Sequence, residues 1–147
     1  MCGIIGCVQR GGDCWPRVYD GLKRLEYRGY DSVGVAVLDQ NAIGIRKKKG
    51  GADALADAYL KGGAGIGHTR WATHGAPSDE NAHPHAAGKF ALVHNGIIEN
   101  FQELKEGLLA KGYVFKSETD TEVLAHLIAE GRKHNPTLLE AFAWALR

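Results

Sequence analysis

Apolar residues recur at helical spacing along much of the chain. Val18, Leu22 and Leu25 lie four and three residues apart, a spacing that puts them on one face of a helix. Leu104 and Leu108 continue the same pattern further along the chain. The predicted helices span residues 14–26, 52–60, 99–111, 120–133 and 138–146.

Polar residues mark where several of these helices begin or end. Asp13 is expected to cap the first helix, and Gly112 is expected to stop the third. The segments 119–122 and 137–140 both have the spacing of a capping box, in which a Thr and a Glu three residues later bond each other's backbone N–H groups. The pattern therefore predicts that helices begin close to Thr119 and Thr137.

Short apolar runs between these helices predict β-strands. Residues 2–8 form such a run, and the turn residues 39–41 are expected to join two further runs as a hairpin. Residues 71–88 lack periodicity and are expected to form a polar loop. The predicted strands span about residues 3–9, 33–38, 42–48, 65–69, 90–94 and 113–116. The alternation of strands and helices by itself indicates an α/β protein.

Composition narrows the range of functions. The chain has 147 residues and a net charge of +1, from 18 Lys and Arg against 17 Asp and Glu, so no strong field is expected to attract nucleic acid. No apolar stretch approaches the length of a membrane span and no secretory signal is apparent, so we expect one cytoplasmic domain with no membrane partner. The charge block at residues 46–49 is expected to be a solvated edge strand.

Cys2 is the sharpest chemical feature of the sequence. The three cysteines, Cys2, Cys7 and Cys14, are odd in number and lack Cys-x-x-Cys spacing, which argues against a disulfide framework or a zinc site. Removal of Met1 would give Cys2 a free α-amine that can act as the general base for its own thiol, as in N-terminal nucleophile enzymes. The plain alternative is a cysteine without a catalytic role.

Three other segments offer groups that suit a small amino-acid substrate. Arg70 and Trp71, at a strand-to-loop junction, could clamp a carboxylate, or Arg70 could form a surface ion pair. Asn95 and Gly96 supply a side-chain amide and an unhindered N–H, which could form an oxyanion hole or a simple turn. Asp120 could bind an ammonium group or only interact with a helix dipole.

Six segments taken together form a recognisable set of motifs. They are Cys2–Gly6, Leu25–Ser32, His68–Gly75, Asn81–His85, His94–Asn100 and Ser117–Glu122. In this wording and order the chain resembles, from residue 2 to its end, the glutaminase domains of the glucosamine-6-phosphate synthase family. These isomerising glutamine:fructose-6-phosphate amidotransferases are a branch of the N-terminal-cysteine glutamine amidotransferases.

The resemblance implies a role for nine residues. Cys2 would attack the side-chain amide of L-glutamine, and Asn95 and Gly96 would hold the tetrahedral oxyanion. The ammonia released would serve the conversion of fructose 6-phosphate to glucosamine 6-phosphate, with no cofactor and no metal ion. The implied substrate-binding residues are Arg70, Thr73 and His74 for the α-carboxylate, Asp120 for the α-ammonium, Trp71 in a closing loop, and Arg28 beside the nucleophile.

The resemblance also implies a fold and partners. The family fold is the N-terminal nucleophile hydrolase fold, an α+β sandwich of four layers, αββα, with two antiparallel sheets. Residues 1–147 would be the N-terminal portion of the glutaminase domain, incomplete on its C-terminal side and without the sugar-phosphate isomerase domain that uses the ammonia. Two sheets built from six short strands would leave open edges, so we expect a longer chain or a homo-oligomer.

Other classes of function remain open from the residues alone. The histidines His74, His83, His85 and His94 lie within a short stretch and could belong to a metal hydrolase, although no motif with zinc-binding spacing is present. The chain could also bind glutamine without turning it over, as a regulatory fragment. An N-terminal-cysteine amidase acting on another substrate is a third alternative.

Overall fold

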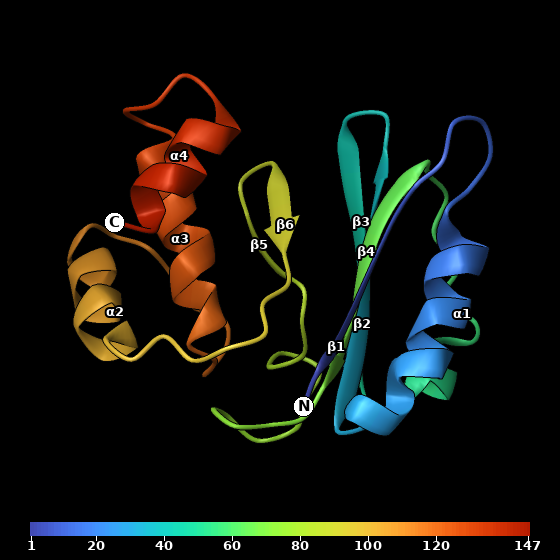
Figure 1. Ribbon diagram of the computed structural model, residues 1–147. Coiled ribbons are helices and arrows are strands. Elements are labelled where there is room, and N and C mark those ends of the chain that lie inside the picture. Colours follow the sequence, from blue (N-terminus) through green and yellow to red (C-terminus); the bar gives the residue numbers. More distant parts are fainter.

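The computed structural model describes residues 1–147, and its elements form two groups (Figure 1). The first group contains β1 (Gly3–Val8), α1 (Trp15–Leu25), β2 (Ser32–Asp39), β3 (Ala42–Lys49) and β4 (Ala64–Arg70), with the short 3-10 helices η1 (Glu26–Arg28) and η2 (Ala52–Leu55). The second group contains β5 (His85–Ala87), β6 (Phe90–Leu92), α2 (Phe101–Ala110), α3 (Thr121–Gly131) and α4 (Leu138–Ala145).

The first group is built on an antiparallel sheet with the strand order β1-β4-β2-β3. β2 and β3 form the hairpin expected from its turn residues, and Gln40 at its tip has a φ of 53°. In the register of the sheet, His68 of β4 lies beside Ile4 of β1 on one side and Gly34 of β2 on the other. β4 therefore joins the N-terminal strand to the hairpin.

One face of this sheet packs against α1. Side chains alternate between the two faces of a strand, so Val33, Val35 and Val37 of β2 share one face. They are almost completely buried in one core with Val18 and Leu22 of α1. The helical spacing that predicted this apolar face of α1 is confirmed.

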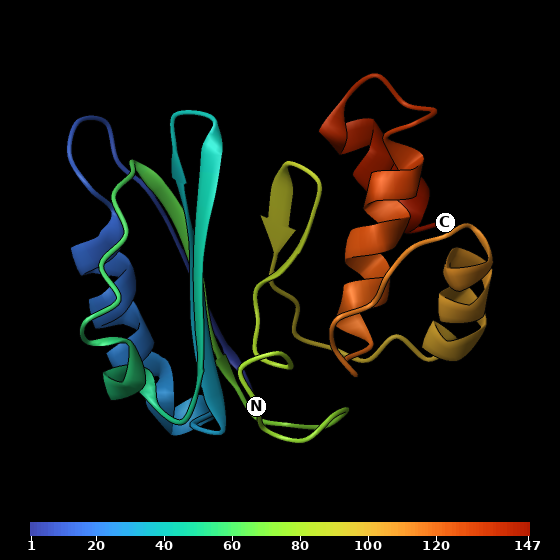
Figure 2. The ribbon, with the colours of Figure 1, turned by 180° about the vertical axis from the view of Figure 1, so that it is seen from behind.

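The other face of the sheet is apolar at one end and carries polar side chains at the other. Ile66 and Leu38 make one end apolar, whereas Cys2, His68 and Arg70 gather toward the other end. This face looks across to the β5–β6 hairpin, beyond which the helices α2, α3 and α4 pack (Figures 1 and 2). The order of layers is α1, the four-stranded sheet, the two-stranded sheet and the helices, which confirms the α+β fold with αββα layers.

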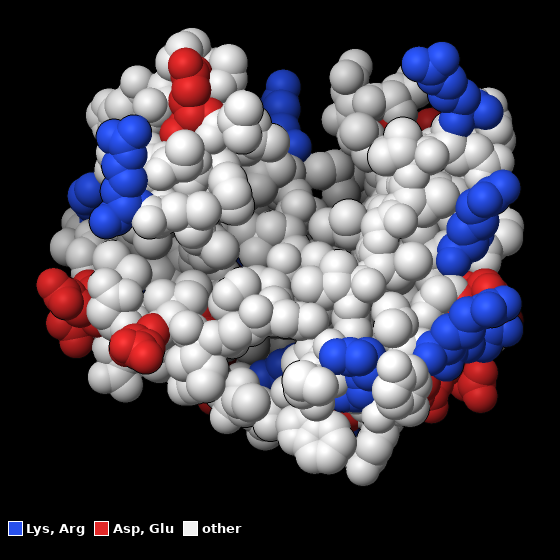
Figure 3. All heavy atoms as spheres, viewed as in Figure 1, with Lys and Arg blue, Asp and Glu red and all other residues white.

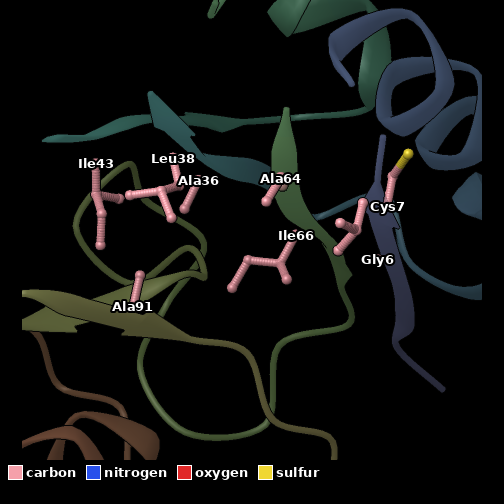
Figure 4. A pocket seen from close by; sticks show the side chains of 10 residues that line it. Gly6, Cys7, Ala36, Leu38, Ile43, Ala64, Ile66 and Ala91 are labelled. Atoms are coloured by element: carbon pink, nitrogen blue, oxygen red, sulfur yellow. The ribbon is translucent and has the colours of Figure 1, made fainter. Parts of the chain in front are cut away.

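An apolar cleft of about 350 Å³ separates the two sheets. Figure 4 shows Ala91 of β6 pointing toward Ile43 and Ile66 of the larger sheet across this space. The helix α4 also turns apolar side chains outward, with Leu139 75% and Phe142 41% exposed. Both surfaces are apolar and open. None of the helices is long and apolar enough to span a membrane.

Charged side chains are unevenly distributed over the surface. Figure 3 shows Lys and Arg along the side of the molecule where α1 lies, and mostly uncharged side chains across the middle of this face. The charge block at residues 46–49 lies on β3, which is an edge strand as expected. Lys48 there pairs with Asp79 at 3.0 Å.

Tertiary hydrogen bonds overturn two expectations near α1. The helix predicted over residues 52–60 is wrong, because only η2 forms there. Asp13 does not cap α1. Its carboxylate instead accepts hydrogen bonds from the N–H of Gly62, at 2.8 Å, and from the hydroxyl of Tyr59. These contacts tie the chain after η2 to the segment before α1, and no helix continues past η2.

Three further expectations differ in the second group. The strand predicted over residues 113–116 is wrong, because Tyr113 and Phe115 pack against the ring of His126 in α3 and pair with no strand. The loop predicted over residues 71–88 contains the short strand β5. Thr119 does not form a capping box, whereas the box between Thr137 and Glu140 at α4 is confirmed.

Candidate active site

A cavity of about 590 Å³ lies where the two groups of elements meet. Most of the residues that line it are polar, in contrast to those of the apolar cleft between the sheets. Of the nine residues singled out in the sequence, all except His74 line it. They are Cys2, Arg28, Arg70, Trp71, Thr73, Asn95, Gly96 and Asp120. Residues far apart in the sequence are thus brought together around one space.

Cys2 lies directly before β1, whose pairing with β4 holds it near the end of that strand. Its Sγ accepts a hydrogen bond from the main-chain N–H of Trp71 at 3.1 Å. Its carbonyl oxygen accepts hydrogen bonds from Nδ2 of Asn95 at 3.1 Å and from Nε of Arg28 at 3.4 Å. The residue is therefore anchored, and its sulfur faces a donor that stabilises a thiolate.

Arg70 ends β4 and is only 4% exposed. Its Nη2 donates to the main-chain carbonyl oxygens of His74 and Gly75, the latter at 3.0 Å. Burial lowers the pKa of Arg70, although a guanidinium stays charged at neutral pH. Nη1 has no hydrogen-bond partner. The side chain is thus held on one side, and its Nη1 is buried without a partner.

Asn95 follows β6 and brings the second group of elements to Cys2. Its Nδ2 donates to the Cys2 carbonyl, and its Oδ1 lies 2.8 Å from Nε2 of His68. The next residue, Gly96, has a φ of 155°, and a Cβ there would lie 2.7 Å from Nε2 of His94. Only glycine fits this position, which sets an unhindered backbone N–H beside the Asn95 amide.

Asp120 precedes α3 and is 4% exposed. Its Oδ2 accepts a hydrogen bond from the N–H of Ile98 at 2.8 Å, and its Oδ1 accepts one from the hydroxyl of Thr121 at 3.4 Å. A carboxylate has about four acceptor positions, so two neutral donors leave room for a cation. The buried negative charge of Asp120 is the counterpart to Arg70 in this cavity.

A partly buried set of hydrogen bonds between Asn81 and Glu118 connects the segments that carry these two charges. Nδ2 of Asn81 donates to the carbonyl of Ala76 at 2.9 Å and to the Glu118 carboxylate at 3.0 Å, and its Oδ1 accepts the N–H of Glu118 at 2.8 Å. Asn81 follows the loop that contains Thr73, and Glu118 comes two residues before Asp120. These hydrogen bonds therefore fix the carboxylate side of the cavity relative to its guanidinium side.

Glu122 holds the backbone just before Asp120. Its carboxylate accepts hydrogen bonds from the N–H of Lys116 at 2.9 Å and from the N–H and hydroxyl of Ser117 at 2.7 and 2.6 Å. Burial acts to raise the pKa of Glu122, but the nearby His126 ring and hydrogen bonds from Ser117 and Lys116 lower it to about 2. An ionised Glu122 thus anchors this segment, in place of the predicted capping box.

The two aromatic side chains among the nine residues singled out in the sequence, those of His74 and Trp71, lie at the edge of the cavity. His74 contributes its main-chain oxygen to Arg70, while its ring packs edge-on against Phe101 with the centroids 5.4 Å apart. Trp71 is 48% exposed and contacts the ring of Tyr30 edge-on at 5.9 Å. A half-exposed indole beside Cys2 gives the edge of the cavity an aromatic side chain.

Three buried histidines pack against one another, and two of them, His68 and His83, line the cavity. The rings of His68 and His83 stack with centroids 4.2 Å apart, and His85 meets His83 edge-on at 4.7 Å. Burial lowers the pKa of His68 to about 4 and of His85 to about 3, and lowers the pKa of His83 further still. All three are neutral at pH 7. No group of three or more His, Cys, Asp or Glu side chains is placed to hold a metal ion, including the histidines at 74, 83, 85 and 94.

Several residues of the cavity received no role from the sequence. They are His68, His83, His94, Ile97, Thr119 and Thr121. Nε2 of His85 lies 2.9 Å from the Thr119 hydroxyl, and Nδ1 of His94 lies 3.2 Å from the Thr121 hydroxyl. For His68 the signal was its two-residue spacing from Arg70, which puts both side chains on one face of β4. The threonine contacts cross between segments and have no local signal.

The comparison with known families decides the assignment. A family model described as "Glutamine amidotransferase domain" matches residues 45–146. The chain belongs to the glutamine amidotransferase domain family. In this amidotransferase domain, Arg70, Asn95 and Asp120 lie within the matched region, whereas Cys2 and β1 precede it.

Relatives of this amidotransferase domain extend the match to the N-terminus. Glutamine-fructose-6-phosphate aminotransferase (isomerizing) from Thermus thermophilus is 54% identical over 155 residues, covering 100% of this chain and 25% of that protein. The enzyme of the same name from Pyrococcus horikoshii is 53% identical over 154 residues, covering 99% of this chain and 25% of that protein. The chain spans about a quarter of the length of these curated relatives.

A solved structure shares the fold of the amidotransferase domain. Glutamine phosphoribosylpyrophosphate amidotransferase from B. subtilis, complexed with ADP and GMP, superposes with a TM-score of 0.83 at 30% identity, covering 99% of this chain and 32% of that one. The fold is therefore similar to that of an amidotransferase named for a different acceptor substrate. The expected relation to N-terminal-cysteine amidotransferases is confirmed.

Proposed function

We propose that this domain hydrolyses the side-chain amide of L-glutamine with Cys2 as its nucleophile. The observation that carries the proposal is the content of one cavity: a thiol, the guanidinium of Arg70 and the buried carboxylate of Asp120. A free amino acid presents one carboxylate and one ammonium group, and each would meet an opposite charge. Such pairing is needed because an unpaired buried charge is costly.

The proposed reaction needs the α-amine of Cys2, so Met1 must be absent. The amine takes the thiol proton while Sγ bonds to the amide carbon, and the carbonyl oxygen becomes an oxyanion. The Nδ2–H of Asn95 and the N–H of Gly96 stabilise this charge, an effect typically worth about 2.7–4 kcal/mol for one donor. The proton then passes to the leaving nitrogen, and the C–N bond breaks to release ammonia. Water attacks the remaining γ-glutamyl thioester, which releases glutamate and restores the thiol.

The other residues of the cavity bind the substrate in this proposal. Arg70 holds the α-carboxylate with help from Thr73, while the main-chain oxygen of His74 orients the guanidinium. Asp120 holds the α-ammonium. Trp71 closes over the entrance, and Arg28 keeps the backbone of the nucleophile in place through its bond to the Cys2 carbonyl.

The names of the relatives suggest where the ammonia goes. We propose that a sugar-phosphate isomerase domain is the partner that uses it to convert fructose 6-phosphate to glucosamine 6-phosphate. The Thermus thermophilus relative is named an isomerizing glutamine-fructose-6-phosphate aminotransferase, and this name supports fructose 6-phosphate as the acceptor in the proposal. Sugar phosphates are charged metabolites held inside cells, so we propose a cytoplasmic reaction. The outward apolar side chains of α4 support a proposal of a homo-oligomer or a further domain that covers them.

Ammonia and glutamate release from L-glutamine tests the proposal. We expect release by the protein with an exposed Cys2 amine, no release by Cys2→Ala, and full release by the matched control Cys7→Ala. Titration calorimetry on Cys2→Ala should still detect glutamine binding. Binding by the wild-type protein without any ammonia release would instead support the regulatory alternative, and undiminished release by Cys2→Ala would contradict the mechanism.

A further inference from the structure

The side-chain amide of Asn95 has two orientations of nearly the same shape. Turning it by 180° exchanges Nδ2, which donates, with Oδ1, which only accepts. Only one orientation offers N–H groups to the oxyanion of the proposed reaction, and the other would set a lone pair against the developing negative charge. Some group must therefore decide which way the amide faces.

His68 is the residue that contacts Oδ1 of Asn95. Its Nε2 lies 2.8 Å from this oxygen, while Nδ2 of Asn95 faces the Cys2 carbonyl at 3.1 Å. Because Oδ1 cannot donate, Nε2 of His68 must carry the hydrogen. Nδ1 of the same ring has no hydrogen-bond partner, as expected for the bare nitrogen of this tautomer. Burial lowers the pKa of His68 to about 4, so the neutral donor persists at neutral pH.

The packing around His68 leaves its ring no freedom to turn. The residue is 1% exposed, and its ring stacks on His83 at an interplanar angle of 16°. Gly34, the neighbour of His68 in the sheet, makes this possible, because a Cβ there would lie 2.0 Å from the carbonyl oxygen of His83. His85 meets the His83 ring edge-on, and its Nε2 lies 2.9 Å from the Thr119 hydroxyl.

We propose that His68 is the positioning residue that orients the Asn95 amide, so that Nδ2 faces the reacting carbonyl. This inference rests on the proposed glutaminase function. His68 acts through Asn95, which interacts with charge that exists only in the transition state, so its loss lowers kcat and leaves the affinity for glutamine unchanged.

Two amide substitutions of His68, which differ in side-chain length, distinguish this positioning role from a purely structural one. A glutamine side chain carries its amide nitrogen about where the imidazole has Nε2, whereas asparagine is one carbon shorter and cannot reach Asn95. We expect His68→Asn to lower kcat by about 10²-fold, within the range for losing an oxyanion donor. His68→Gln should recover most of that loss. KM for glutamine and the dissociation constant of glutamate should stay within about threefold in both variants.

Two further measurements address the connection between the two residues. In the double variant His68→Asn/Asn95→Ala, kcat should be no more than about threefold below that of Asn95→Ala alone, since both changes remove one interaction. In the unmutated protein, the ¹⁵N resonances of the His68 ring should report a hydrogen on Nε2. This second measurement needs no substitution and stands even where a variant does not fold.

The outcomes separate the two proposals. A wild-type protein that releases no ammonia contradicts the proposed function. An active wild type in which His68→Asn retains full kcat, or in which His68→Gln is no better than His68→Asn, overturns the role of His68 alone. So does a hydrogen on Nδ1, or a double variant whose losses multiply.

Discussion

The main-chain N–H of Trp71 donates a hydrogen bond to Sγ of Cys2 across 3.1 Å. This short contact depends on a third residue, because the backbone of Arg70 and Trp71 packs directly against Gly29. A Cβ on Gly29 would lie 2.6 Å from the carbonyl carbon of Arg70 and 2.8 Å from the nitrogen of Trp71. The absence of a side chain at position 29 thus sets the position of a donor to the sulfur.

Gly29→Ala is therefore expected to move the Trp71 N–H away from Cys2. The thiolate loses a donor, so alkylation of Cys2 by iodoacetamide at pH 7 should slow about tenfold, with a parallel loss of kcat/KM. The matched control is Gly107→Ala in α2, where a Cβ meets nothing within 4 Å. That control should leave alkylation unchanged and stabilise the helix by about 0.5–1 kcal/mol. Equal alkylation rates in both variants would contradict the prediction.

Asn95 and Arg70 should separate catalysis from binding. Asn95→Ala is expected to lower kcat by about 10²–10³-fold with little change in KM, because the oxyanion exists only in the transition state. Arg70→Ala is expected to raise KM instead, because the α-carboxylate does not change during the reaction. Steady-state ammonia release at several glutamine concentrations measures both, and the reverse pattern would overturn the assignment of the cavity.

Retention of Met1 should abolish activity. Met1 is part of the cavity wall, and its peptide bond converts the proposed base into an amide that cannot accept a proton. Intact mass and ammonia release should therefore change together when an aminopeptidase removes Met1 from a preparation that carries it. Full activity in a preparation whose mass shows Met1 in every molecule would exclude the α-amine as the base.

The buried histidines should make the protein less stable in mild acid. Burial lowers the pKa of His68 to about 4 and of His85 to about 3, below the value of about 6.5 in an unfolded chain. Below pH 6.5 the unfolded state therefore binds protons that the folded state does not. Stability falls as pH drops from 6.5 toward 4, by up to about 1.4 kcal/mol per pH unit for each histidine, and does not depend on them above 6.5.

Urea unfolding at pH 7.5, 6 and 5 measures this dependence. The lowered pKa of Glu122, about 2, adds a second loss of stability only between about pH 4.5 and 2, because its ionised form is bonded in the fold. His134→Gln is the matched control, since His134 is exposed and its replacement should leave the curve unchanged. Equal stability at pH 7.5 and 5 would contradict the prediction.

Filling the cleft between the sheets should stabilise the fold. Ala91 points into this space of about 350 Å³, so Ala91→Leu would bury added apolar surface worth about 1–2 kcal/mol. The same substitution on the exposed face of α2, Ala110→Leu, is the control and should change stability by less than about 0.5 kcal/mol. Thermal melts compare the two variants. A lower melting temperature for Ala91→Leu would show that the sheets are closer together than the cleft implies.

The sequence predicted best what depends on neighbouring residues. The helical spacing of Val18 and Leu22, and the turn between β2 and β3, are local signals, and both elements form as expected. The motifs around Arg70 and Asn95 also marked the lining of the cavity, because each carries its chemistry within a few residues. The roles given to these residues stay predictions.

The errors come from contacts between distant segments. Asp13 has the sequence context of a helix cap, but the N–H of Gly62 and the hydroxyl of Tyr59 compete for its carboxylate. The apolar alternation of Tyr113 and Phe115 is that of a strand, but His126 of α3 offers them a ring to pack against. The sequence pattern within a single helix or strand gives no information about such distant partners.

The two charged ends of the proposed substrate would be held by different halves of the molecule. Arg70 ends a strand of the four-stranded sheet, whereas Asp120 precedes a helix of the opposite layer, and an open apolar cleft lies between the sheets. A bound amino acid would contact both halves and hold them together. Its departure after each turnover would weaken the contact between the two halves at Cys2 and Asn95. The ligand-free domain would therefore be less stable than the ligand-bound one. Glutamate at 100 times its dissociation constant would restore about 2.7 kcal/mol of stability.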